Sequence, residues 1–201
     1  MSSISNESKL ATNLSYLFHP LFLWTGGVLI FVLQDIGVTL QTVIIVFLLL
    51  IVSLGSIYFA FLPFKKEIKT VVIQGLPQKD RLRIRIICML VLGVMGCMAI
   101  VLILSKSAIH LILYFISTLQ ILLYSFILTY RIKTSAHVTA ISALVGVFVS
   151  VFSPIFILLI PFIGIVVWAR IKMKAHTGIE SLTGFIIGFF VSLITFWVGL
   201  K

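Results

Sequence analysis

The chain has 201 residues, of which 61% are hydrophobic and only 10% are charged, and its mean hydropathy is +1.29. Soluble domains are closer to half apolar and a quarter charged, so this composition excludes an ordinary soluble domain and predicts one integral membrane domain over residues 1–201. The formal net charge of +10 does not indicate a nucleic-acid partner, because the basic residues stand in short loops between apolar runs. There they meet the membrane surface, or an anionic substrate at that surface.

Seven apolar runs predict an all-α, polytopic transmembrane helical bundle of about six to seven spans. Helices are expected because lipid requires each segment to satisfy its own backbone hydrogen bonds. Residues 1–16 are predicted to be a polar N-terminal tail, without the layout of a signal peptide. The runs are Leu17–Gln34, Leu40–Leu62, Ile84–Leu104, Ala108–Tyr130, Ala136–Phe152, Pro154–Ala169 and Ile179–Leu200.

The cysteines, the prolines and the lengths of the runs allow more local predictions about the helices. Cys88 and Cys97 both lie in the third run and are interpreted as small core residues rather than as a disulfide or a metal pair. The fifth and sixth runs have about 16 residues each, so their ends are expected near the membrane interface. Pro154 is expected at a helix start and Pro161 at a kink.

The last run contains Gly184 and Gly188, which are one helical turn apart. This spacing fits a helix that packs closely against a neighbour.

The loops predict the orientation in the membrane. If seven helices alternate, one side holds 13 of the 15 Lys and Arg residues, and the other holds only Lys106 and Lys201. The positive-inside rule makes the basic side cytoplasmic, and we expect a plasma-membrane location. The segments on the basic side are the N-terminus, 63–83, 131–135 and 170–178.

Three polar clusters are expected to converge on this basic side. Many cations with few anions suit a multiply charged oxyanion such as phosphate, which guanidinium groups bind in a bidentate way. One imidazole can attack phosphorus while a second protonates a leaving oxygen. His176 and Glu180 are four residues apart, so on a helix the carboxylate could hold one ring nitrogen. The clusters comprise Lys79, Arg81, Arg83 and Arg85; Arg131, Lys133, Ser135 and His137; and Arg170, His176 and Glu180.

The third cluster resembles the last signature of the type 2 phosphatidic acid phosphatase superfamily, Ser-Arg-x5-His-x3-Asp. Here it reads Ala169-Arg170-x5-His176-x3-Glu180, and "TSAH" at 134–137 resembles that family's Pro-Ser-Gly-His. The resemblance covers residues 79–200, which are expected to form a phosphatase-like core.

The resemblance implies a membrane lipid phosphatase that hydrolyses a lipid phosphomonoester or diphosphate, such as an isoprenyl phosphate or phosphatidate, without a metal or other cofactor. His176 would be the nucleophile that forms a phosphohistidine, Glu180 would orient it, and His137 would be the acid for the leaving alcohol. The implied phosphate-binding residues are Arg170, Ser135, Lys133, Arg81 and Lys79.

Departures from the family pattern keep an alternative open. The first signature, Lys-x6-Arg-Pro, is absent, and Lys79 and Arg81 are its best substitutes. Ala136 replaces a glycine, and Glu180 is one methylene longer than Asp. A non-catalytic protein that binds anionic lipid headgroups is therefore the second hypothesis. A small transporter is a weaker third, because the apolar runs have few mid-membrane polar residues.

The remaining polar residues receive structural interpretations. His19 precedes Pro20 and is interpreted as a residue that begins a helix, while His110 is interpreted as structural on the opposite side. Lys172 and Lys174 are interpreted as anchors near lipid headgroups.

Overall fold

The computed structural model describes residues 6–34, 81–104, 109–128 and 131–201, together with the isolated positions 44, 47, 51 and 55. Within these residues the chain is all helical, and no strand occurs. The helices are α1 (Asn6–Leu17), α2 (Pro20–Gln34), α5 (Arg81–Leu104), α6 (Ile109–Leu128), α7 (Ala136–Val151), the 3₁₀ helix η3 (Pro154–Leu159), α8 (Ile160–Lys172) and α9 (Gly178–Gly199).

Four helical segments are long and apolar enough to cross a membrane. The described parts of α5 and α7 with the same character are shorter, at Val91–Leu104 and Ala136–Val151. Large apolar side chains cover the outer surface, as expected for contact with lipid; Phe22, for example, is 69% exposed. The fold is therefore a plausible helical membrane bundle. The four segments are Lys9–Phe31, Ile109–Leu128, Pro154–Lys172 and Gly178–Gly199.

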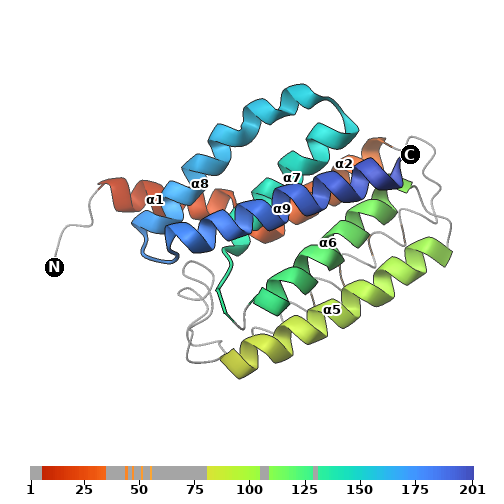
Figure 1. Ribbon diagram of the computed structural model, residues 1–201, viewed down its shortest axis with the longest axis horizontal. Helices are drawn as coiled ribbons and strands as arrows, with labels where there is room; N and C mark the ends of the chain where they lie inside the picture. The colour runs from red at the N-terminus through yellow and green to blue at the C-terminus, as the bar shows by residue number, and fades with distance from the viewer. Residues whose placement is uncertain are drawn as a thin grey trace.

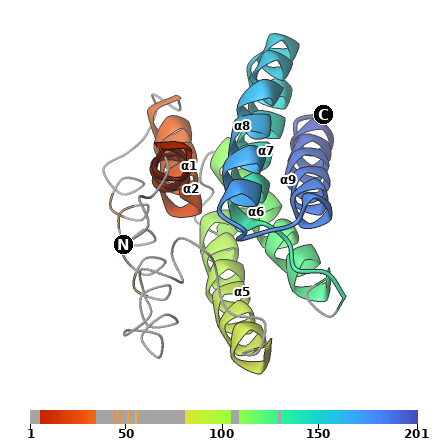
Figure 2. The same ribbon diagram turned by 90° about the vertical axis from the view of Figure 1, so that its left-hand side faces the viewer.

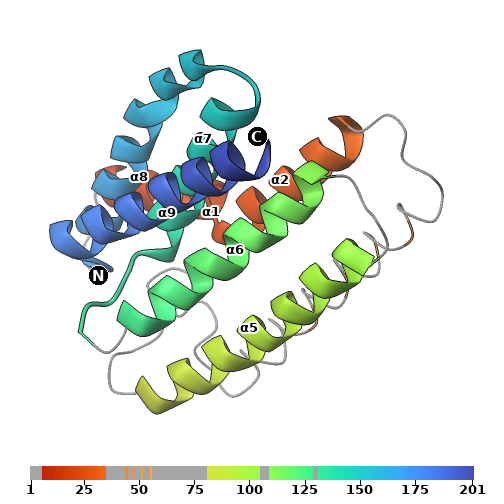
Figure 3. The same ribbon diagram turned by 45° about the vertical axis from the view of Figure 1, so that its right-hand side comes forward.

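The helices form a layered bundle. α5 and α6 lie side by side, α6 packs on α9, and α9 packs most extensively on α7 (Figures 1 and 3). α8 returns beside α7, and α1 lies against α8 near the end of the bundle where α9 begins (Figure 1). One apolar core forms around Phe31, Leu102 and Phe196, and another forms around Val138 and Val166.

Glycines make the contact between α7 and α9 unusually close. A Cβ added at Gly146 would lie 2.5 Å from the backbone oxygen of Phe189. A Cβ at Gly188 would clash with the backbone oxygen of Thr139, and one at Gly184 would meet α7 as well. The predicted close packing at Gly184 and Gly188 is confirmed.

The predicted runs agree well with α6, α7 and α9, whose bounds differ from the prediction by at most two residues. The second predicted run, 40–62, lies outside the described residues except at four helical positions. The segment 1–16, predicted to be a polar N-terminal tail, forms the helix α1 from Asn6 onward. α1 buries Ala11 and Ser15 on one face, and this amphipathic spacing lets a polar segment form a packed helix.

Two further sequence predictions need correction. Pro161 does not kink a continuous helix; it lies in the first turn of α8, directly after η3, where a missing N–H costs nothing. Pro154 does begin a helix, η3, whose N-cap is Ser153. Cys97 is exposed on α5, so its assignment to the core is wrong. A thiol is apolar enough to face lipid, and composition alone does not separate the two environments. The side chain of Cys88 lies outside the described residues.

Candidate active site

The second and third polar clusters meet near one end of the bundle, where α7 and α9 begin and α8 ends (Figure 2 looks onto this end). The backbone N–H of Ser135 donates to the backbone oxygen of Glu180 at 3.3 Å, which ties the start of α7 to the start of α9. The N–H of Ala175 donates to the backbone oxygen of Arg170 at 3.1 Å, and Lys174 turns the chain with a φ of 54°. This tight turn holds the α8 and α9 ends of the site together.

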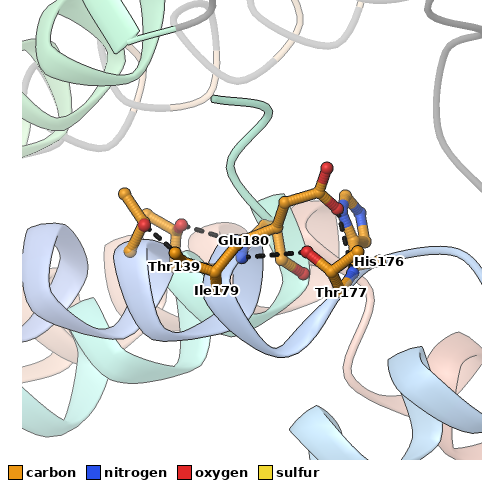
Figure 4. A network of polar contacts seen from close by, with 7 residues as sticks. Thr139, His176, Thr177, Ile179 and Glu180 are labelled. Atoms are coloured by element: carbon orange, nitrogen blue, oxygen red, sulfur yellow. Dashed lines mark hydrogen bonds and ion pairs between the residues drawn. The ribbon is translucent and has the colours of Figure 1, made fainter. Parts of the chain in front are cut away.

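A histidine–carboxylate pair lies at the N-terminus of α9 (Figure 4). His176 Nδ1 and Glu180 Oε2 are 3.0 Å apart, and the two side chains are 4% and 13% exposed. The same carboxylate oxygen accepts a hydrogen bond from the N–H of Thr177 at 3.0 Å, and the Thr177 hydroxyl accepts one from the N–H of Glu180. This capping box fixes the carboxylate while it holds one ring nitrogen, so Nε2 is the nitrogen directed away from Glu180.

A buried guanidinium faces this pair. Arg170 is fully buried in the last turn of α8, and its Nη1 donates to the Ser15 hydroxyl of α1 at 3.3 Å. Its charge acts on His137, His176 and Lys133. The structure therefore gathers one guanidinium, one ammonium, one carboxylate and two imidazoles from the end of α8, the starts of α7 and α9, and the segments that precede these two helices. A buried charge of this kind is costly unless it has partners.

Two buried polar atoms point to an oxygen-rich ligand. The Ser135 hydroxyl and His137 Nε2 are both buried, and neither has a hydrogen-bond partner among the described residues. Leaving such a group unsatisfied costs about 1–3 kcal/mol, so native structures seldom do it without a reason. Both side chains can donate to an oxyanion, which would remove this cost.

The electrostatic environment favours neutral forms. Burial lowers the pKa of His176 to about 4; the charges of Lys133 and Arg170 act in the same direction, and Glu180 opposes them. The ring is therefore neutral at pH 7, as a nucleophile must be. Burial also lowers the pKa of Lys133, as does Arg170, while Glu180 raises it.

The structure places the other predicted residues as follows. Lys79 and the side chain of Arg81 lie outside the described residues, so their predicted roles are untested. Arg131 is exposed. Lys172, predicted to be a headgroup anchor, forms an ion pair with Glu7 of α1.

One histidine at the site was missed by sequence reasoning. His19 does precede the first residue of α2, but its ring also lies 5.4 Å from the ring of His137, at an interplanar angle of 86°. His110, in contrast, stacks on Phe31 away from the cluster. The sequence offered two weak signals for His19, its polarity beside an apolar run and the block His19-Pro20-Leu21.

The described residues thus define a helical, membrane-type bundle with a buried histidine–carboxylate pair beside buried cations. Among these residues no group of three or more His, Cys, Asp or Glu side chains is arranged to hold a metal. Comparisons with family models, curated proteins and solved structures give no significant match for the chain.

Proposed function

We propose that the chain is an integral membrane phosphohydrolase acting on a lipid phosphate or diphosphate, with a core like that of the type 2 phosphatidic acid phosphatases. The observation that supports it best is the pairing of His176 Nδ1 with Glu180 at 3.0 Å beside the buried Arg170. The pair gives a neutral imidazole with a defined tautomer, and the cation compensates a phosphate's charge.

In the first step, His176 Nε2 attacks phosphorus and forms a P–N bond while the P–O bond to the lipid breaks. His137 gives its proton to the departing oxygen, which leaves as the lipid alcohol, or as the lipid monophosphate when the substrate is a diphosphate. Glu180 stabilises the positive charge that develops on the His176 ring. Arg170, Lys133 and the Ser135 hydroxyl hold the equatorial oxygens, with Arg81 and Lys79 as further candidates.

In the second step, water attacks the phosphorus of the phosphohistidine and the P–N bond breaks. His137, now neutral, accepts the water proton, and inorganic phosphate leaves. The electron pair returns to Nε2, so His176 regains its neutral form. Both imidazoles are then ready for another cycle, because His137 has regained from the attacking water the proton that it gave to the leaving oxygen.

The membrane setting supports a lipid substrate over a soluble one. The polar cluster lies where apolar helices end, so a headgroup can bind there while its tail stays among apolar side chains. Isoprenyl phosphates and phosphatidate both meet this requirement. We further propose about six to seven spans and a site on the cytoplasmic side of the plasma membrane, because the basic residues of the described segments 131–135 and 170–178 lie at this end.

The test is phosphate release from phosphatidate and from an isoprenyl phosphate by the full chain in detergent, with a chelator present. His176→Ala is expected to lose nearly all turnover, whereas His110→Phe, a change outside the cluster, is expected to keep it. Normal hydrolysis by His176→Ala would refute the proposal. Binding of these lipids, weakened by Arg170→Ala but without turnover in the unaltered chain, would instead support the non-catalytic alternative.

A further inference from the structure

His19 lies at the junction of α1 and α2, far in sequence from the other site residues, yet it contacts one of them. Its ring meets the His137 ring edge-on, with 5.4 Å between centroids and 86° between planes. On its other side it meets the ring of Phe22, with 6.1 Å between centroids. The ring of His19, which contacts the His137 ring, is thus itself in contact with a second aromatic ring, that of Phe22.

The backbone around His19 is held from both sides. The N–H of His19 donates to the carbonyl of Tyr16 at 3.2 Å, and the His19 carbonyl accepts from the N–H of Leu23 at 3.2 Å. Pro20 restricts the backbone directly after it. α1 is tied to α8 by the contact between Ser15 and Arg170 at 3.3 Å. A junction anchored in this way can hold a neighbouring ring in one orientation.

The orientation of His137 matters because its role is directional. Proton transfer requires the ring nitrogen to lie within hydrogen-bond reach of the leaving oxygen. His137 is 5% exposed, and its Nε2 has no hydrogen-bond partner among the described residues. The ring also makes a hydrogen bond to the backbone of Ser15, and the contact with His19 is a second restraint on its orientation.

We propose that His19 is a positioning residue for His137, which it orients through the edge-on contact of the two rings. This inference rests on the proposed phosphatase function. Because His19 acts through His137, its effect is confined to the two proton transfers that His137 makes, to the leaving oxygen and from the water that attacks the phosphohistidine. A misplacement of about 1 Å can cost about 100-fold in rate, so the loss of the contact is expected to be measurable.

The experiment compares two substrates and two variants. Phosphatidate loses an alkoxide that needs a proton, whereas para-nitrophenyl phosphate loses a phenolate that does not. His19→Phe keeps an aromatic ring at the position, and His19→Leu removes it at a similar volume. His110→Phe is the matched control, since it replaces a histidine that stacks outside the site. All are assayed as full chains in detergent, after a thermal unfolding check.

For phosphatidate we expect His19→Leu to lower kcat/KM by about 10- to 100-fold, and His19→Phe by less than about threefold. For para-nitrophenyl phosphate the kcat/KM of both variants is expected to stay within about threefold of the unaltered chain, because kcat/KM reports only the formation of the phosphohistidine and a phenolate leaves without a proton. An equal loss on both substrates, or an equal loss in Phe and Leu variants, would overturn the positioning role while leaving the phosphatase proposal intact. Undiminished turnover by His176→Ala, or none by the unaltered chain, would reject both.

Discussion

Glu180→Gln removes the negative charge that contacts His176, the proposed nucleophile, and keeps the length of the side chain. The carboxylate accepts two hydrogen bonds, from His176 Nδ1 and from the N–H of Thr177, each at 3.0 Å. A glutamine has the same length and can also complete a capping box, so the start of α9 is expected to keep its structure. The amide can no longer stabilise a cationic ring, and its NH₂ group could favour the wrong tautomer of His176.

The size of the effect follows from the contact that is lost. A buried hydrogen bond to a charged group contributes about 1.5–3 kcal/mol, and every 1.4 kcal/mol is about tenfold in rate. The charge alone therefore accounts for roughly 10- to 150-fold. An inverted tautomer adds to this, since the corresponding amide replacement in a serine protease triad costs about 10⁴-fold. We expect kcat to fall by about 100-fold or more.

The assay is phosphate release at saturating lipid phosphate, together with thermal unfolding of the same samples. Thr177→Ala is the matched control, because it removes the N-cap hydroxyl but keeps the backbone N–H that Glu180 accepts from. It is expected to destabilise the protein by about 1 kcal/mol and to change kcat by less than about threefold. If the two variants lose the same activity, Glu180 acts as a helix cap and the catalytic reasoning is wrong.

Three further predictions concern single features of the structure. In histidine-labelled protein, an NMR titration should show that the His176 ring gains its proton near pH 4 and is neutral above that pH. A titration midpoint near pH 6.5 for this ring would contradict a buried site flanked by cations. Gly188→Ala should destabilise the protein by about 1–3 kcal/mol in thermal unfolding, since the added Cβ meets a backbone carbonyl of α7, whereas Gly164→Ala, with open space around it, should not. Glu7→Gln removes the exposed ion pair with Lys172 and should leave the thermal unfolding midpoint nearly unchanged; a clear drop in the midpoint would show that this pair helps hold α1 on α8.

The sequence predicted the apolar helices well because lipid leaves few alternatives for such runs. α6, α7 and α9 begin and end close to the predicted positions, since polar residues or glycine mark their limits. α1 could not be found in the same way, because its apolar face is narrow; of its described side chains, only Ala11 and Ser15 are buried. Its helix depends on packing against α8, which is a tertiary effect.

Contacts between the predicted site residues could be predicted where the residues share one short segment. His176 and Glu180 are one helical turn apart, so their contact follows from local geometry. The meeting of Ser135 with Glu180 depends on glycines that bring α7 and α9 together. His19 carried no local signal of its contact with His137, because the two rings meet only after α2 has packed on α7.

The proposed mechanism requires opposite protonation states of His176 and His137, although both rings lie near the same cations. His176 must be neutral to attack, whereas His137 must hold a proton to release the alcohol. The charge of Arg170 acts on both rings, and that of Lys133 also acts on His176, so these cations favour neutral imidazoles before substrate binds. A phosphate dianion between them would reverse the balance at His137, because its charge stabilises an added proton on the nearer ring. His176, held by Glu180 on its other nitrogen, keeps Nε2 for attack. On this argument the substrate's own charge protonates the acid, so a neutral isostere of the phosphate should bind poorly and leave His137 deprotonated.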